Sequence, residues 1–321
     1  MGAMRFQTDH HPVSEAPPPR GDSARSRTVH RCVFCGTRSE SPETATAECN
    51  VRAHLGERFT VWRCSACRGL HCRDVVDLGH YYADYPFRRA RLAWPMRLVY
   101  RTLLSRLKRE GFDARRSLLD YGCGNGTFIE WLRERGIARV GGYDPYGPPD
   151  GLGDRRVLEL GPFDVVLLQD VVEHVEDPAA LLAELDGYAA PGGVIVIGTP
   201  NADRIDLRNT DRYINELHVP YHRHIVTRAR LGEMGARLGW TVVRHYDRPY
   251  WDYPFLGLNQ RAGREYQRLL GDGIDAFFEP VKIGRALTSP RYLFFAVFGW
   301  LLGNRADMTV VFRKTGVSAS R

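Results

Sequence analysis

Alternating apolar strands and amphipathic helices fill most of the chain from position 117 onward. Short apolar runs predict strands at 118–121, 139–143, 163–168, 193–198, 240–246 and 308–313. Helical periodicity predicts helices at 127–135, 178–188 and 228–238. This order is typical of a doubly wound α/β fold, in which helices cover both faces of a largely parallel sheet.

A separate amphipathic helix precedes this alternation. Apolar residues recur at helical spacing between 96 and 109, namely Met96, Val99, Tyr100, Leu103, Leu104 and Leu107. The stretch 86–116 holds ten basic and two acidic residues, so its charge of +8 exceeds the +7 of the whole chain. Since the leucines form the apolar face, we expect Arg97, Arg101 and Lys108 on the solvated side.

These patterns divide the chain into five parts. Residues 1–31 are polar and Pro-rich, which predicts a disordered tail. A cysteine-rich segment occupies 32–75, and a Tyr-rich segment with the basic helix occupies 76–116. The α/β core covers 117–246 plus 307–315. The aromatic, Arg-rich interval 247–306 predicts a mostly helical insertion that could serve as a substrate lid.

The composition bounds the classes of protein that need consideration. Of 321 residues, 43% are hydrophobic and 26% are charged, which excludes a wholly disordered, collagenous or coiled-coil chain. No apolar run reaches the roughly 18–20 residues that span a bilayer, and no secretory signal is expected. We therefore expect a cytoplasmic protein with reduced thiols. Its basic charge leaves peripheral contact with a membrane open, and nothing indicates the oligomeric state.

Six of the seven cysteines lie within one short segment. Cys32 and Cys35 form one C-x2-C pair, and Cys64 and Cys67 form a second after 28 intervening residues. Two such turns can complete a tetrahedral Zn²⁺ site, and four thiolates leave no open coordination position. We predict a structural zinc ion. Other donors in the segment keep the exact ligand set open, namely Cys49, His71 and Cys72.

A glycine-rich turn follows the first core strand. Asp120-Tyr121 leads into Gly122-Cys123-Gly124-Asn125-Gly126, and Asp144 ends the next strand. Glycines let the backbone approach a ligand closely, and a carboxylate at Asp144 can accept hydrogen bonds from ribose hydroxyls. The spacing is G-x-G-x-G, and no Gly-Lys-Ser/Thr follows. The turn therefore predicts a nucleoside ligand without a pyrophosphate.

The sequence 120–126 resembles the first motif of the class I S-adenosylmethionine-dependent methyltransferases. Asp144 matches the ribose-binding acid of that family, 163–175 matches its fourth strand, and 191–193 matches the turn before its fifth. The resemblance implies a seven-stranded Rossmann-like sheet with an antiparallel last strand, S-adenosylmethionine as cofactor, and methyl transfer. It implies cofactor contacts from Asp120, Gly122, Cys123, Gly124, Asp144, Gln169 and Asp170.

The stretch after the third long strand carries two carboxylates and an imidazole. Asp170, Glu173 and His174 have the spacing of one helical face, and the run is similar to a metal-binding run in ubiquinone-pathway O-methyltransferases. A divalent cation is one interpretation. The other is that Glu173 orients neighbouring loops and His174 packs under the cofactor.

A histidine-rich loop follows the strand at 193–198. In this fold that loop lies at the reactive edge of the sheet, where a general base would take the proton of an attacking hydroxyl. The candidates are His222 and His224, with Tyr221 beside them; His218 is a weaker one. Some of these side chains could instead orient the loop. Tyr81 or Tyr82 could cover the cofactor, or pack between domains.

Two functions remain after these observations. The first is methylation of a small molecule, such as a sugar, lipid-linked or natural-product intermediate, at oxygen and with a histidine base. The second is methylation of ribosomal RNA, in which the zinc ribbon and basic helix bind phosphates. Both kinds of enzyme can carry a zinc ribbon. We favour the small molecule, because the insertion offers an apolar lid and the motifs for methylating amino groups or pyrimidine C5 are absent.

Overall fold

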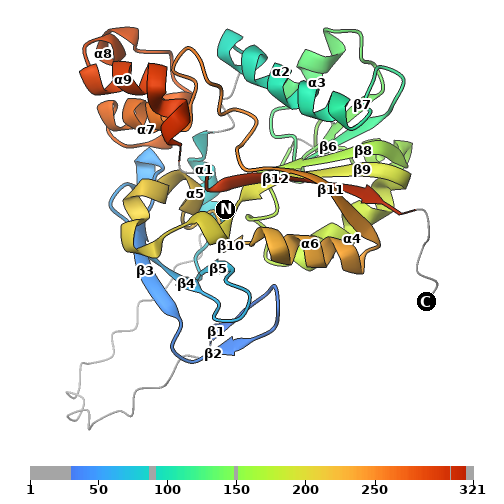
Figure 1. Ribbon diagram of the computed structural model, residues 1–321, viewed down its shortest axis with the longest axis horizontal. Coiled ribbons are helices and arrows are strands. Elements are labelled where there is room, and N and C mark those ends of the chain that lie inside the picture. Colours follow the sequence, from blue (N-terminus) through green and yellow to red (C-terminus); the bar gives the residue numbers. More distant parts are fainter. Residues whose placement is uncertain (1–29, 87–91, 148–150, 304, 316–321) are drawn as a thin grey trace, which may run out of the picture.

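The structure of the protein is a computed structural model that describes residues 30–86, 92–147, 151–303 and 305–315. A sheet with helices on both faces forms the core, a small β domain lies at one edge of it, and a helical unit packs above that domain (Figure 1). Most of the predicted tail lies outside the described residues. Its last two residues, His30–Arg31, form strand β1.

The central sheet has the order β11-β12-β9-β8-β6-β7. Strands β6 (Leu118–Tyr121), β7 (Val140–Tyr143), β8 (Phe163–Gln169) and β9 (Ala189–Pro200) pair in parallel. Strand β12 (Asp307–Lys314) runs antiparallel between β9 and β11 (Trp240–Tyr246). The predicted α/β sheet with an antiparallel last strand is therefore present.

The described sheet has six strands, whereas the resemblance implied seven. The difference lies between β7 and β8. There the described residues form turns and the 3-10 helix η3 (Arg155–Leu160), and residues 148–150 fall outside the description. The sequence 147–151 reads Gly-Pro-Pro-Asp-Gly, and its prolines cannot donate ladder hydrogen bonds.

Two hydrophobic cores sandwich the sheet. Helices α2 (Trp94–Arg109) and α3 (Thr127–Arg133) bury Leu103, Leu107 and Trp131 against one face. Helices α4 (Pro178–Tyr188) and α6 (Arg228–Arg237) bury Leu182 and Leu231 against the other. The leucine face of α2 is buried while Arg101 and Lys108 are exposed, as its periodicity predicted.

The cysteine-rich segment forms a β domain joined to the core. Besides the short pair β1 and β2 (Arg38–Ser39), it contributes β3 (Glu43–Glu48), η1 (Arg52–His54), β4 (Arg58–Arg63) and β5 (Leu70–Cys72). The fourth strand of its sheet is β10 (His224–Ile225), which belongs to the histidine-rich loop. The sheet order β10-β5-β4-β3 therefore fixes that loop directly on the cysteine-rich domain.

Short helices connect the domains. Helix α1 (Leu78–Ala83) carries the tyrosines after β5, and η4 (Ala202–Arg204), η5 (Leu207–Tyr213) and α5 (Ile214–Leu217) lead from β9 to the histidine-rich loop.

The described part of the interval 247–306 is mostly helical from Gln260 onward, as predicted. It comprises α7 (Gln260–Leu269), η6 (Ile274–Phe277), α8 (Ile283–Leu287), α9 (Pro290–Phe298) and η7 (Gly299–Leu302). The insertion also touches the cysteine-rich domain, because the backbone N–H of Ile274 donates to Asn50 O at 2.7 Å. None of the helices in the described ranges is long and apolar enough to cross a membrane.

Candidate functional site

The glycine turn between β6 and α3 forms an open cradle. Gly122 has a φ of +76°, and a Cβ there would lie 2.3 Å from Cγ2 of Val171. Gly124 has a φ of +56°, and a Cβ there would meet no atom of the described residues within 4 Å. Side chains are thus excluded at Gly122 by contact and disfavoured at both positions by the backbone. The turn leaves room for a ligand over Gly124.

Asp144 is held at the rim of this cradle by backbone donors. Its Oδ2 accepts from Gly124 N and its Oδ1 from Tyr146 N, each at 2.9 Å. Each oxygen keeps a further lone pair, because a carboxylate offers about four acceptor sites. The carboxylate can therefore still bind ribose hydroxyls, the role that the resemblance implies.

Two further carboxyl groups belong to neighbouring strands of the sheet: Asp120 lies in β6, and Asp170 directly follows β8. Burial raises the pKa of Asp120 to about 7, and the charge of Asp144 adds to this shift. Asp170 stands just after β8 at an exposed rim, yet the surrounding protein desolvates it and raises its pKa to about 6. Carboxyl groups on or just after β6, β7 and β8 suit a cationic ligand at this edge of the sheet.

The other residues assigned to the cofactor have more modest roles. Gln169 packs its amide against Gly198, where a Cβ would lie 2.1 Å from Oε1, and its buried Nε2 has no hydrogen-bond partner within the part of the chain that the structure describes. The Cys123 thiol is surrounded by protein, and this burial raises its pKa. A thiol nucleophile needs a low pKa, so this burial does not favour a nucleophilic role for Cys123.

Tyrosines from α1 and from the turn after β7 lie side by side next to the cradle. The ring of Tyr82 stacks on Tyr146 at 5.7 Å, and its hydroxyl shares a hydrogen bond of 3.0 Å with Nδ1 of His174. The Tyr81 hydroxyl instead donates to Oε2 of Glu57 at 2.6 Å, within the cysteine-rich domain. Of the two predicted lid candidates, the structure thus places Tyr82 beside the cofactor residues.

Glu173, His174 and His222 form a compact group with ligand atoms within 4.8 Å of one another. Glu173 is completely buried; its Oε2 accepts from Thr199 Oγ1 at 3.0 Å, and its Oε1 has no hydrogen-bond partner among the described residues. Nε2 of His222 lies 3.8 Å from that Oε1, while Nδ1 donates to Glu216 O at 2.7 Å. Burial lowers the pKa of both imidazoles, to about 4 for His174, so both are neutral.

This group differs from the predicted set of Asp170, Glu173 and His174. That set assumed a helix from Asp170 onward, but the next helix, α4, begins only at Pro178. Asp170 itself has a left-handed φ of 54°, which turns it away from helical spacing. The third member of the group is His222, from a loop about fifty residues later in the sequence.

The two other predicted catalytic side chains have packing partners. The Tyr221 ring is completely buried, and its hydroxyl donates to Tyr81 O at 3.0 Å. His224 lies in β10, where its Nδ1 is 3.0 Å from Nδ1 of His71. The structure therefore places His222 with Glu173 and His174, and His224 against the cysteine-rich domain.

Sequence reasoning missed a buried chain of hydrogen-bonded polar side chains that begins at His218 in the histidine-rich loop. His218 shares hydrogen bonds with Oδ1 of Asn50 and, at 3.0 Å, with the hydroxyl of Tyr85. Asn50 also donates to Asn215 at 2.9 Å, and Asn215 donates to Gln267 of α7 at 3.0 Å. This chain links the cysteine-rich domain, the loop and the insertion. Its members are spread over the whole sequence, so no local motif marks them.

The four predicted zinc ligands converge. The sulfur atoms of Cys32 and Cys67 are 3.5 Å apart, and those of Cys35 and Cys64 are 3.6 Å apart. A tetrahedral site with ~2.3 Å Zn–S bonds would place its sulfurs roughly 3.8 Å apart, so the cluster fits. His71 lies outside it, with Nε2 at 3.2 Å from Cys32 Sγ.

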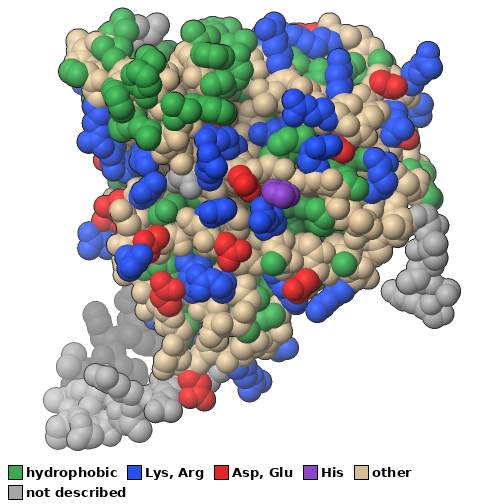
Figure 2. Space-filling model, in the orientation of Figure 1, with side chains coloured by type: hydrophobic (Ala, Val, Ile, Leu, Met, Phe, Trp, Pro, Cys, Tyr) green, Lys and Arg blue, Asp and Glu red, His purple; other side chains and the backbone are tan. Residues whose placement is uncertain are grey.

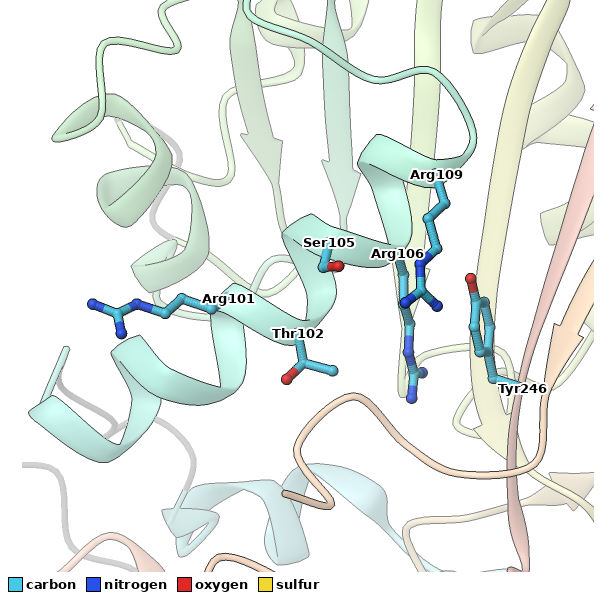
Figure 3. Close-up of a pocket in the computed structure, with 6 residues that line it drawn as sticks. All are labelled: Arg101, Thr102, Ser105, Arg106, Arg109 and Tyr246. Atoms are coloured by element: carbon cyan, nitrogen blue, oxygen red, sulfur yellow. The ribbon is translucent and has the colours of Figure 1, made fainter. Parts of the chain in front are cut away.

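A hollow of about 360 Å³ opens between α2 and β11, lined by Arg101, Thr102, Ser105, Arg106, Arg109 and Tyr246. Arg106 and Arg109 turn toward Tyr246, whereas Arg101 points the other way (Figure 3). Arg106 donates to the backbone oxygens of Arg248 and Pro249. None of the predicted site residues lines this hollow, and Arg106 is engaged in joining α2 to the insertion.

Residues 90–245 match a protein family described as a methyltransferase domain. The ubiquinone biosynthesis O-methyltransferase of Aeromonas salmonicida is 30% identical over 156 residues, which cover 39% of this chain and 63% of that protein. The protein of the same name from Sodalis glossinidius is 29% identical over 208 residues, with coverage of 56% and 76%.

The tRNA U34 carboxymethyltransferase of Pseudoalteromonas translucida is 31% identical over 153 residues, covering 41% of this chain and 47% of that protein. Among solved structures, a SAM-dependent methyltransferase from Archaeoglobus fulgidus aligns at 20% identity with a TM-score of 0.38, covering 67% of this chain and 94% of that chain.

The matched region contains the glycine turn, Asp144 and the Glu173 group, and it confirms the predicted methyltransferase core. The family match and the two curated relatives named O-methyltransferases support a methyltransferase domain. The chain spans 63%, 53% and 48% of the length of the first three curated relatives. The cysteine-rich segment, 32–75, and the whole insertion, 247–306, lie outside the matched range.

Proposed function

We propose that the protein transfers the methyl group of S-adenosylmethionine to a hydroxyl oxygen of a small-molecule acceptor. When bound, the cofactor supplies an electrophilic methyl group on a sulfonium. The cradle at Gly122 and Gly124 would receive it, Asp144 would bind its ribose, and the carboxyl groups of Asp120 and Asp170 would favour its positive charge.

The observation that carries the proposal is the position of Tyr82. Its ring stacks on Tyr146, whose backbone N–H binds Asp144, and its hydroxyl is bonded to His174. An aromatic wall with an imidazole behind it thus adjoins the ribose-binding acid. Such a wall suits a partly apolar acceptor whose hydroxyl must lose a proton.

The Glu173 group would receive that proton. His222 remains our candidate base, because Nδ1–H is committed to Glu216 O and Nε2 keeps its lone pair. His174 is half-buried and contacts Tyr82, so it could pass the proton inward from the acceptor to His222. In this proposal Tyr221 and His224 are positioning residues.

A divalent cation is a second use of the same three side chains. Two imidazoles and one carboxylate are suitable ligands, and the unpartnered Oε1 of Glu173 faces the group. A cation there would orient the acceptor oxygen. Activity that survives exhaustive chelation with the ribbon zinc retained would leave only the acid–base role.

The names of the relatives bear on the acceptor. Two are named ubiquinone biosynthesis O-methyltransferases, which favours an oxygen atom of a small molecule as the acceptor. One is a tRNA U34 carboxymethyltransferase, which keeps RNA as the alternative acceptor, together with the exposed basic residues Arg101 and Lys108.

Transfer of label from S-[methyl-³H]adenosylmethionine tests the proposal. The panel would contain catechols, long-chain phenols, sugars, total RNA and ribosomal RNA, with product mass confirming the methylated atom. We expect labelled methyl ethers from the hydroxylated small molecules. Label that enters only RNA would overturn the small-molecule proposal, and label on nitrogen or carbon would overturn the acceptor atom.

A further inference from the structure

Helix α9 and the following turn η7 expose their most apolar side. Six large side chains on them are exposed, at positions spaced i, i+1, i+4, i+5, i+8 and i+9: Leu293, Phe294, Val297, Phe298, Leu301 and Leu302. Val297 and Leu301 keep 65% and 68% of their surface in contact with solvent. This spacing makes one continuous helical stripe. An ordinary surface helix would bury such a stripe.

The opposite side of α9 is anchored to the protein. Asn259 Nδ2 donates to Phe295 O at 3.0 Å, and a Cβ at Gly299 would lie 2.4 Å from Oδ1 of Asn259. The Tyr292 ring lies 6.2 Å from that of Tyr266 in α7. The stripe is therefore turned outward by specific contacts on the other side of the helix.

Neighbouring elements enlarge the exposed surface. Phe255 and Leu256 are each 64% exposed at a turn, and a Cβ at Gly257 would lie 2.7 Å from the hydroxyl of Tyr292 and 3.5 Å from Cβ of Ala296. That turn thus lies against α9. Helix α8 packs beside α9 and exposes Leu287. We call these residues and the six of the stripe the apolar face; it is part of the green surface at the upper left of Figure 2.

The charge around the apolar face is positive. Positions 280–303 hold Lys282, Arg285 and Arg291 and no acidic residue. Lys282 and Arg291 pair with Glu279 and Glu265 but stay 55% and 61% exposed. Arg285 is exposed, donates to Leu269 O at 3.3 Å, and has no carboxylate partner in the described part of the chain.

We propose that the apolar face inserts into the interfacial layer of a membrane that contains anionic lipids. Apolar and aromatic side chains rimmed by cations match such a surface, where burial of the side chains and attraction to lipid phosphates add together. A second copy of this chain is a poorer occupant, because a twofold contact would bring two acid-free, basic segments together.

Flotation with extruded vesicles tests this proposal without reference to methyl transfer. One set contains phosphatidylcholine with about 30% phosphatidylglycerol, and the other phosphatidylcholine alone. The wild-type protein should float with the anionic vesicles, and more weakly at high salt. The Val297→Asp, Leu301→Asp double variant should lose roughly a hundredfold or more in partitioning, because two apolar anchors are removed. Arg285→Gln should lose roughly fivefold.

The matched control is Val75→Asp, Leu160→Asp, which changes two other exposed apolar residues and should bind like the wild type. Unchanged melting would establish that all variants are folded. The proposal is overturned by a wild type that floats with neither vesicle, or by undiminished binding of the Val297→Asp, Leu301→Asp variant. A third outcome also overturns it: sedimentation shows that the wild type is a dimer, and the double variant is a monomer that still binds vesicles.

Discussion

The proposed site has two halves, one for the cofactor and one for the acceptor, that are built in opposite ways. The cofactor half comes from one continuous stretch, β6 to β8, whose backbone turns and carboxyl groups form an open rim. The acceptor half joins α1, the histidine-rich loop and the cysteine-rich domain, and its imidazoles and tyrosines are buried and bonded to one another. The first depends on local geometry, and the second depends on contacts between distant segments.

This difference predicts how each half fails. A change in the cofactor half should reduce binding of S-adenosylmethionine while the rest of the protein stays folded. A change in the cysteine-rich domain should also disturb the histidine-rich loop, because β10 is a strand of that domain's sheet and Asn50 bonds to His218. The variants below separate the two halves, from the largest expected effect to the smallest.

Cys64→Ser should have the largest effect. Structural zinc contributes about 10–16 kcal/mol in zinc-finger peptides, so losing one thiolate should release the ion, unfold the ribbon and abolish methyl transfer. Binding of S-adenosylmethionine should change less than about threefold, because the cradle lies elsewhere. Metal analysis and calorimetry measure both. Cys72→Ser, outside the cluster, should retain one zinc per chain; zinc that persists in Cys64→Ser would contradict the assignment.

His222→Ala should lower the rate of methyl transfer by roughly 10²–10⁴-fold, the usual contribution of a general base. The affinity for S-adenosylmethionine should be unchanged. His224→Ala is the comparison, and we expect a loss of stability at the ribbon junction with a much smaller effect on turnover of the folded protein. Full turnover in His222→Ala, or a larger rate loss in His224→Ala, would contradict our choice of base.

Asp144→Ala should weaken binding of S-adenosylmethionine by roughly tenfold to a hundredfold, since hydrogen bonds to a charged acceptor contribute about 1.5–3 kcal/mol. Titration calorimetry measures the change. Asp154→Ala, at a half-buried carboxylate that pairs with Arg156, should bind as the wild type does. Equal affinity in both variants would remove Asp144 from the cofactor site.

Binding of S-adenosylmethionine should weaken as the pH falls. The pKa of Asp120 is raised to about 7 and that of Asp170 to about 6, so both are ionised at pH 8 and take up protons toward pH 5.5. Protonation removes negative charge that favours the sulfonium, and affinity should fall by roughly tenfold between pH 8 and 6. S-adenosylhomocysteine lacks the sulfonium charge, and its affinity should change less. A pH-independent ratio of the two affinities would exclude this effect.

The sequence by itself determined the parts whose partners are close along the chain. The order of strands and helices, the glycine turn, Asp144 and the two C-x2-C pairs all follow from short spacings. Cys32 and Cys67 cluster because the two C-x2-C turns come together in the fold. The presence of two such pairs already predicted this. Helix α2 also follows from spacing, because its leucines define the face that must be buried.

Only the tertiary structure decided how the acceptor side is arranged. His222 and His224 are alike in sequence, yet pairing of β10 with β5 puts His224 against His71, while His222 meets Glu173. Tyr81 and Tyr82 are adjacent in sequence but have different partners. The Tyr81 hydroxyl donates to Glu57, and the Tyr82 hydroxyl is hydrogen-bonded to His174. Asp170 does not share a helical face with Glu173 and His174, because its φ is left-handed. For these histidines and tyrosines the partner side chain lies many residues away in the sequence. No local pattern can therefore predict which partner each side chain meets.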